Sequence, residues 1–344
     1  MKKVPLILIL LGFLLAGCAG PPAPDPGLIQ VQTPSPVIFD TDMAHEDMIS
    51  ALFLLSHPNV DLKGITVTGT GEAHCGPGVV NALGLVKVSG HAEIPVGCGR
   101  ETPLAGNHEF PAEWRQGADA AYGVDIPGGG EPSGLNAADL IVDILQNSDE
   151  PVTIVAVGPL TTIAEAIQRD PSITSRVKGI FIMGGAVNVD GNVGFSGVGF
   201  DNKYAEWNIY IDPVAANIVF DSGAPVTLVP LDATRDVPVT RAFYNALEDN
   251  LNSPSADLVH EMLAANLDFV DSGGFQFWDT LTSGVFTDES LAGFEEMHLS
   301  VVEAEGPESG YTKTDPGGPA VRVATGADRV KFESLLLTIL NWED

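Results

Sequence analysis

The sequence predicts an α/β fold, a doubly wound and mainly parallel sheet with helices on both faces. Two observations predict it. Short apolar runs such as Val37–Asp40 and Val152–Val157 alternate along the chain with longer segments of helical period. These runs lack the alternation of polar and apolar side chains that marks a half-exposed strand, which is typical of strands buried on both faces. Strands that alternate with helices in this way favour parallel pairing through crossover connections.

The elements follow in order along the chain. The expected strands are Val37–Asp40, Leu62–Thr68, Val152–Val157, Gly179–Met183 and Val226–Pro230. The expected helices are His45–Ser56, Gly78–Val88, Ala137–Gln146, Thr161–Arg169 and Pro213–Phe220. The tail differs, because Leu299–Glu303 and Ala320–Ala324 predict a small antiparallel addition, closed by a helix over Asp328–Leu340.

The N-terminus predicts export from a bacterial cytoplasm. Residues 1–17 have the charged, apolar and small-residue regions of a signal peptide. The ending Leu15-Ala-Gly-Cys18 resembles a lipobox, so Cys18 is expected to be the lipidated first residue of a mature protein in the cell envelope. The alternative is an ordinary secretory signal with an incidental cysteine. Residues 18–35 predict a Pro-rich spacer, and the length of residues 36–344 predicts a single domain.

Charge limits the partners. The chain has 46 acidic and 16 basic residues, a formal net charge of -30. Nucleic acids and anionic lipid surfaces would be repelled at long range, so we expect no nucleic-acid partner and membrane contact only through the lipid anchor. Past the signal peptide, no apolar segment is long enough to span a bilayer.

Cys75 and Cys98 are the other two cysteines. An oxidising compartment favours a disulfide between them. The alternative is two separately buried thiols.

Four carboxylates follow the first strand closely: Asp40, Asp42, Glu46 and Asp47. Two carboxylates about 4 Å apart repel by roughly 4 kcal/mol at an effective dielectric near 20, so the cluster needs a cation, a shared proton or wide separation. Oxygen donors favour Ca²⁺ or Mg²⁺. We expect His45 to be a solvated residue at the start of the helix, with a role as ligand as the alternative.

Several segments together resemble the inosine-uridine preferring nucleoside hydrolase family. The family's first strand ends in Asp-x-Asp-x-x-x-Asp-Asp, and the present chain reads Asp40-Thr-Asp42-Met-Ala-His-Glu46-Asp47. The resemblance extends from about Pro36 to Leu340 and depends on the joint order of its motifs. The later matching segments are Val155–Ala164, Gly179–Ala186, Asn202–Pro213 and Phe277–Asp279.

The resemblance implies Ca²⁺-dependent hydrolysis of the N-glycosidic bond of a small-molecule ribonucleoside. It implies that Asp42, Asp47, Asp279 and the Val157 carbonyl bind the metal, and that Asp42 also accepts the proton of the attacking water. Alternation along the strand places Asp40 either behind these ligands or as a weaker ligand. Family members are often dimers or tetramers, so the resemblance leaves homo-oligomerisation open.

The same resemblance assigns residues to the substrate. Glu46 stands where the family has an aspartate that binds a ribose hydroxyl, Asn208 matches a ribose-binding asparagine, and Glu206 the residue at the 5′ end of the sugar. Asn202 is expected to help, with Asn192 as a competitor for that role. The base pocket is expected in loops 106–123 and 240–274.

Two further departures concern the reaction. Trp278 stands where broad-specificity members have a histidine that protonates the leaving base, so we expect Trp278 to stack on a purine, aided by Trp114 or Phe110; the alternative is a core tryptophan. Thr68-Gly-Thr-Gly-Glu72-Ala-His74 lacks the family's Gly-Asn. Glu72 or His74 could replace that asparagine, or both could be turn residues.

Two alternatives of other classes stay open. The first is a nucleoside-binding lipoprotein that has lost the reaction. The second is a haloacid-dehalogenase-like phosphatase, because Asp40-x-Asp42 after an apolar strand resembles the nucleophile and acid of that family. Its motif differs here at Ala44, and the chain is poor in lysine.

Overall fold

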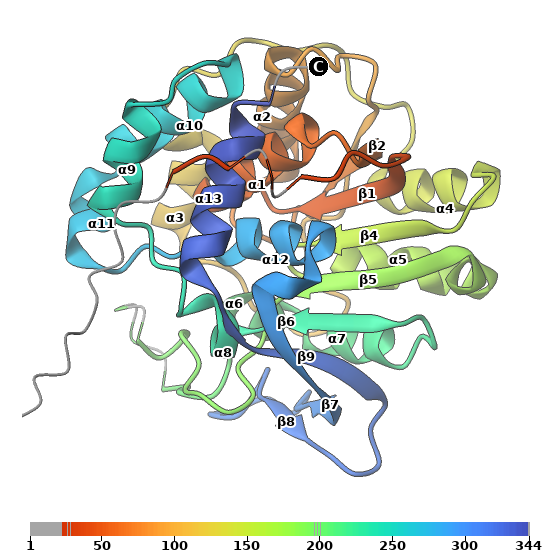
Figure 1. Cartoon of the computed structure of the whole chain (residues 1–344). Coiled ribbons are helices and arrows are strands. Elements are labelled where there is room, and N and C mark those ends of the chain that lie inside the picture. Colours follow the sequence, from red (N-terminus) through yellow and green to blue (C-terminus); the bar gives the residue numbers. More distant parts are fainter. Residues whose placement is uncertain are drawn as a thin grey trace, which may run out of the picture.

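The computed structural model describes residues 23–25, 27, 29–195, 197, 199 and 201–342. Cys18 and the expected signal peptide lie outside these residues. Within them, nine strands form one sheet in the order β3-β2-β1-β4-β5-β6-β9-β7-β8. Figure 1 shows this order from β2 to β8. The doubly wound, mainly parallel fold predicted from the sequence is confirmed.

The order in which the chain adds parallel strands reverses at β1, in the middle of the sheet. From β1 the chain first builds outward through β2 and β3, then returns to place β4 on the other side of β1. A crevice forms outside the carboxyl ends of the strands at such a switch point, and ligands bind there. The parallel strands are β1 (Ser35–Thr41), β2 (Val60–Val67), β3 (Val96–Cys98), β4 (Val152–Ala156), β5 (Val177–Met183) and β6 (Val226–Val229).

The tail adds the predicted antiparallel strands. β9 (Ala320–Ala327) pairs in parallel with β6 and antiparallel with β7 (Ala292–Val301), which also pairs with β8 (Thr312–Thr314). β7 begins well before the predicted Leu299. The sequence did not predict this first half as a strand, because it is largely exposed, carries charged side chains and so lacks an apolar pattern. The final helix α13 spans Arg329–Leu340.

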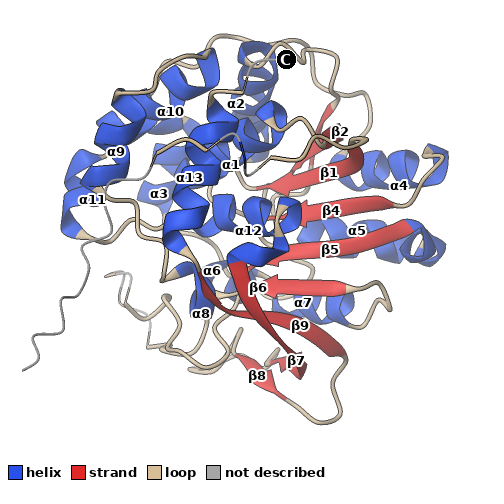
Figure 2. Ribbon diagram, viewed as in Figure 1, coloured by secondary structure: helices blue, strands red, loops and turns tan. Residues whose placement is uncertain are grey.

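Helices cover both faces of the sheet, each over its own apolar core (Figure 2). One face carries α1 (His45–Ser56), α2 (Cys75–Val88), α10 (Pro254–Ala265), α12 (Trp278–Thr287) and α13, and the other carries α4 (Ala137–Asn147), α5 (Thr161–Arg169) and α7 (Pro213–Phe220).

The two regions expected to be loops are largely helical. Residues 106–123 contain α3 (Ala112–Asp119) and the turn η2 (Ala121–Gly123), and residues 240–274 contain α9 (Arg241–Glu248), α10 and α11 (Leu267–Ser272). Their helices are short, and tertiary packing stabilises them more than local propensity does. The remaining short elements are α6 (Trp207–Ile211), α8 (Leu231–Thr234), η3 (Pro171–Arg176) and η4 (Glu289–Leu291).

The described part of the Pro-rich segment lies along the domain. The Asp25 amide donates to Thr338 Oγ1 of α13 over 2.7 Å, and Ser334 of the same helix donates to the Ala23 carbonyl. Further on, the Gln32 amide donates to Asn59 Oδ1 over 2.7 Å. The division of the chain at residue 35 stays a prediction, but the residues before it are held by the fold.

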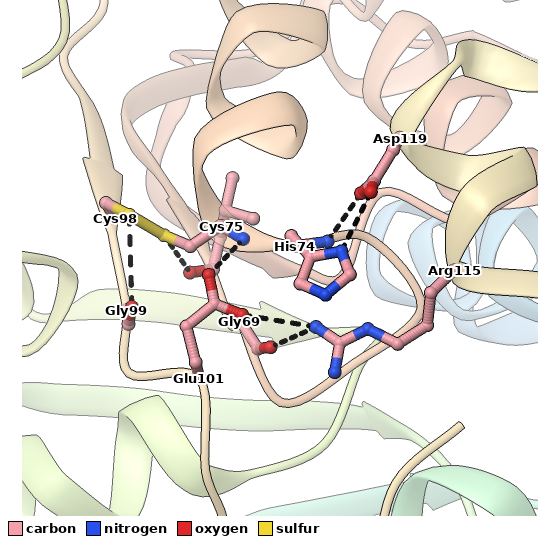
Figure 3. The surroundings of a disulfide bond; sticks show 9 residues. Gly69, His74, Cys75, Cys98, Gly99, Glu101, Arg115 and Asp119 are labelled. Atoms are coloured by element: carbon pink, nitrogen blue, oxygen red, sulfur yellow. Dashed lines mark hydrogen bonds and ion pairs between the residues drawn. A yellow bond between two sulfur atoms is a disulfide. The ribbon is translucent and has the colours of Figure 1, made fainter. Parts of the chain in front are cut away.

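A disulfide joins Cys75 at the start of α2 to Cys98 at the end of β3, with their Cα atoms 5.5 Å apart (Figure 3). The Glu101 carboxylate accepts a hydrogen bond from the Cys75 amide over 2.8 Å and another from Arg115. Arg115 also donates to the Gly69 carbonyl over 2.8 Å. The disulfide therefore fixes the loop between β2 and α2 at its α2 end, and the Arg115 guanidinium fixes it at its β2 end.

Among the helices of the described residues, none has both the length and the apolar character that crossing a bilayer requires.

Replacing Cys75 and Cys98 with serine should lower the free energy of unfolding by about 3 kcal/mol, because the bond closes a loop between residues separated by 23 positions. Thermal unfolding of the double variant should occur several degrees below that of the wild type. The matched control is Cys18→Ser, which leaves the bond intact. Equal unfolding temperatures for wild type and double variant would contradict this role.

Candidate active site

The site lies at the switch point, where β1 and β4 end side by side. The Val157 amide, just past β4, donates to the Asp40 carbonyl over 2.8 Å. The Thr68 amide, just past β2, donates to the Thr41 carbonyl over 2.8 Å. Three chain segments thus converge at the end of β1, where the sequence places its acidic residues.

The turn from β1 into α1 sets Asp42 beside Asp47. Met43 has a φ of 55°, the left-handed conformation that few residues other than glycine adopt. Thr41 stabilises this turn, because its hydroxyl accepts from the Met43 amide over 3.0 Å and donates to the Asp47 carboxylate. The Asp42 amide donates to the same Asp47 oxygen over 3.0 Å.

Asp42 is enclosed by two glycines. A Cβ atom on Gly71 would lie 2.0 Å from the Asp42 Cβ, and one on Gly158 would lie 2.9 Å from it. Only a residue without a side chain permits so close an approach of the backbone. The Glu72 amide then donates to Asp42 Oδ2 over 3.0 Å, so the loop after β2 holds the carboxylate in place.

Asp279 reaches this cluster from a distant part of the chain. The Glu46 carboxylate accepts from the amides of Asp279 and Thr280 and from the Thr280 hydroxyl, and so caps the N-terminus of α12. This places the Asp279 carboxyl within interacting distance of those of Asp47 and Glu46. The longer side chain of Glu46 thereby has a structural use, while its contact with ribose stays a prediction.

The expected ribose-binding residues lie on the other side of the switch point. Glu206 caps α6, accepting from the Asn208 amide over 2.9 Å, and it also accepts from the Gly185 amide over 2.8 Å. The Asn208 side-chain amide donates to the Val157 carbonyl over 3.0 Å and to the Met183 carbonyl over 3.3 Å. Asn208 therefore adjoins the carbonyl that was expected to bind metal.

Asn202 and Asn192 have contacts that serve the loop after β5. Asn202 donates to the Ser309 carbonyl over 2.7 Å and accepts from the Tyr204 and Ala205 amides. Asn192 accepts from the Trp207 amide over 3.1 Å. These bonds shape the backbone next to Glu206, and a sugar contact for either asparagine stays a prediction.

Asp40 is fully buried, and its expected place behind the metal ligands stays a prediction. Its Oδ2 accepts from the Thr66 hydroxyl over 2.5 Å, whereas Oδ1 has no hydrogen-bond partner among the described residues. A buried carboxylate oxygen without a donor is costly and calls for a proton or a cation nearby.

His45 does not lie in solvent, which corrects the expectation from the sequence. Its ring is buried, packs edge-on against Tyr122 at 4.8 Å, and accepts at Nε2 from Asn266 over 2.6 Å. Burial lowers the pKa of His45 to about 4, so it is neutral. The next ring along, Phe275, also packs against Trp278 at 6.0 Å.

Trp278 is therefore in an aromatic cluster separate from its expected helpers. Phe110 stacks on Trp207 at 5.1 Å, and Trp114 packs on the same Trp207 at 5.3 Å. These three rings adjoin Glu206 and not Trp278. Stacking of Trp278 on a base stays a prediction, without support from Phe110 or Trp114.

The two candidates for the missing asparagine differ in surroundings. His74 is exposed and pairs with Asp119 over 2.8 Å (Figure 3). Glu72 accepts from the Tyr122 hydroxyl and lies in the field of Asp42.

Burial dominates the electrostatics of the cluster. It raises the pKa of Asp40 to about 8 and those of Glu46, Glu72 and Glu206 to about 7. The pKa values of Asp47 and Asp279 are raised well above the usual range, first by burial and then by neighbouring carboxylates.

The donor set fits a hard divalent cation. The ligands that the family resemblance implies are the carboxylates of Asp42, Asp47 and Asp279 and the Val157 carbonyl, which are oxygen donors of the kind that Ca²⁺ prefers. The orphaned Asp40 oxygen adds to the demand for positive charge. In the described part of the chain, no group of three or more His, Cys, Asp or Glu side chains is already arranged as a metal cage. Binding would therefore require the carboxylates to close around the ion.

Sequence reasoning missed the residues that shape the site. Thr41, Thr280 and Tyr122 each hold a carboxylate through a hydroxyl. No pattern marks them, because the contacts of Thr280 and Tyr122 join distant segments and the contact of Thr41 depends on the left-handed turn at Met43. Gly71 was recognisable, since a glycine-rich turn after a strand indicates a close backbone approach.

Comparisons with known proteins give the family and confirm the fold. Residues 37–334 match the family model described as inosine-uridine preferring nucleoside hydrolase. A probable uridine nucleosidase of rice (Oryza sativa subsp. japonica) is 38% identical over 205 residues, which are 59% of this chain and 60% of the relative. The chain thus matches about three fifths of the length of such curated relatives.

Two solved structures share the fold over nearly their whole length. A plant nucleoside hydrolase has a TM-score of 0.79 and 30% identity, covering 90% of this chain and 99% of its own. A purine-preferring ribonucleoside hydrolase from Gardnerella vaginalis has a TM-score of 0.77 and 28% identity, covering 89% and 98%.

Without a cation, stability should fall as pH rises from about 4 to about 8. The folded state raises the pKa of Asp40 from 3.8 to about 8, so this carboxyl takes up a proton on folding. Its contribution is fully present below the unfolded pKa and is lost as pH rises through the folded one. Each such proton gives a slope of about 1.4 kcal/mol per pH unit.

Thermal unfolding with a chelator at several pH values measures this slope. Asp40→Asn should flatten it, whereas replacing the partly exposed Asp61 with Asn should leave it unchanged. A wild-type stability that rises between pH 5 and pH 8 would contradict the assignment.

Proposed function

The chain belongs to the inosine-uridine preferring nucleoside hydrolase family, and on that basis we propose that it hydrolyses the N-glycosidic bond of ribonucleosides with a bound Ca²⁺. The observation that carries the proposal is the convergence of Asp42 and Asp47 with Asp279, more than two hundred residues away along the chain. This is the arrangement that the family resemblance implies for the metal ligands. The phosphatase alternative gains no comparable support.

The residues suit the charge that develops in the reaction. Cleavage of a glycosidic bond passes through an oxocarbenium-like ribosyl cation, which buried carboxylates and carbonyl oxygens beneath the sugar stabilise. Ca²⁺ bound by Asp42, Asp47, Asp279 and the Val157 carbonyl would orient and acidify the attacking water and hold the vicinal hydroxyls of ribose. Asp42 would accept the proton of that water.

The remaining groups would hold the substrate. Asn208 and Glu206 are fixed beside the Val157 carbonyl by their backbone contacts, so they can bind ribose without reorganisation. Trp278 directly precedes Asp279, and we propose that it stacks on a purine base. The rice relative is named for uridine and the Gardnerella relative for purines, so both classes of nucleoside belong in the test.

The purified chain should release base and reducing sugar from inosine, guanosine, adenosine or uridine with Ca²⁺ and lose this activity with a chelator. Gly71→Ala should reduce kcat at least a hundredfold, because the new methyl group would displace Asp42. The matched control is Gly76→Ala, whose added Cβ meets no atom within 4 Å.

Absence of base release by the wild type would overturn the enzymatic proposal. Tight nucleoside binding in that case would instead support a binding protein that has lost the reaction.

We also propose that the chain is a lipoprotein anchored through Cys18 in the bacterial cell envelope. Since Ala23 is already bonded to α13, such an anchor would hold the domain close to the bilayer and not at the end of a free tether. Expression in bacteria with a radiolabelled fatty acid should label the wild type and leave Cys18→Ser unlabelled. Secretion of an unlabelled wild-type chain would refute the anchor.

A further inference from the structure

The loop after β2 carries a second acidic group into the site. The backbone amide of Glu72 donates to Asp42 Oδ2 over 3.0 Å, and that of Ala73 donates to the Asp42 carbonyl over 2.9 Å. The loop is thus attached to both the side chain and the main chain of Asp42. Any group at the tip of this loop has a fixed position relative to the Asp42 carboxylate.

The Glu72 side chain is held from the opposite side by Tyr122. The Tyr122 hydroxyl donates to Glu72 Oε2. Glu72 Oε1 has no hydrogen-bond partner among the described residues, and the side chain is only partly buried, so this oxygen can still accept a hydrogen bond. The charges of Asp42 and Asp47 both raise the pKa of the Tyr122 hydroxyl. Tyr122 and Glu72 therefore lie next to the carboxylate cluster.

Tyr122 keeps this position in an unfavourable backbone conformation. Its φ is 51° and that of Ala121 is 47°, both in the left-handed region. Such residues persist only where their surroundings hold them, and they concentrate at functional sites. Here the ring packs edge-on against His45, and Gly117 leaves it room, since a Cβ there would lie 3.0 Å from Tyr122 Cε1.

We propose that Glu72 is a catalytic residue that accepts a hydrogen bond from the attacking water through Oε1, and that Tyr122 is the residue that positions it. The inference depends on the proposed glycosidic hydrolysis. It gives Glu72 the place of the asparagine that is missing after the second strand. His74, the other candidate, is committed to Asp119. While Glu72 orients the water, Asp42 takes its proton, so Glu72 itself neither gains nor loses one.

Two sugars test the contact without catalysis. The oxygen of the attacking water becomes the C1 hydroxyl of ribose, and 1,4-anhydroribitol lacks that hydroxyl. Binding of both to the full chain with Ca²⁺ can be measured by titration calorimetry. Glu72→Ala should weaken ribose binding about tenfold or more and leave anhydroribitol binding unchanged, because only ribose loses a hydrogen bond to a charged group.

Other variants separate catalysis from structure. Glu72→Gln should largely restore ribose binding, because its amide oxygen still accepts a hydrogen bond. Tyr122→Phe should have a smaller effect than Glu72→Ala in the same direction, and Tyr311→Phe, which alters a tyrosine packed against Tyr204, should have none. In hydrolysis assays, Glu72→Ala should lower kcat with little change in KM.

Equal weakening of both sugars in Glu72→Ala would overturn the proposal, because it would indicate general disruption of the site. Unchanged ribose binding would overturn it as well. If the wild type prefers ribose to anhydroribitol through Glu72 but hydrolyses no nucleoside, the contact stands and the proposed function fails.

Discussion

Mutual repulsion among buried carboxylates is the constraint on which the rest of this structure depends. Four carboxylates are buried near the end of β1, those of Asp40, Asp42, Asp47 and Asp279. Arg115 lowers the pKa of Asp42 by its charge, without a hydrogen bond to it. Removing an ionised carboxylate from water costs several kcal/mol after relaxation. A divalent cation bound among these four carboxylates would offset that cost.

Several devices hold the acidic groups against that repulsion. The left-handed turn at Met43 and the hydroxyl of Thr41 set Asp42 against Asp47. Glu46 uses its carboxylate to cap α12 and so brings in Asp279. The disulfide and Arg115 fix the loop that approaches Asp42. These contacts keep the carboxylates close together, although their mutual repulsion would separate them in an unconstrained chain.

The sequence predicted the parallel sheet, the antiparallel tail and the acidic cluster, because apolar runs and the order of motifs are local signals. It missed α9, α10 and α11 in a region expected to be a loop, because packing stabilises such short helices more than local propensity does. It placed His45 in solvent, because nothing local indicates that Asn266 and Phe275 enclose it. It could not place Tyr122 beside Glu72, because the two residues are distant in the sequence and Tyr122 reaches Glu72 from a left-handed backbone conformation.

A crystal of the full chain soaked in Ca²⁺ tests the central claim most directly, through the anomalous scattering of the ion. One strong peak should lie among the carboxylates of Asp42, Asp47 and Asp279 and the Val157 carbonyl, with those oxygens at 2.3–2.6 Å, about the usual Ca²⁺ distance. A map without a peak at that position, at a Ca²⁺ concentration that occupies other sites, would contradict the account.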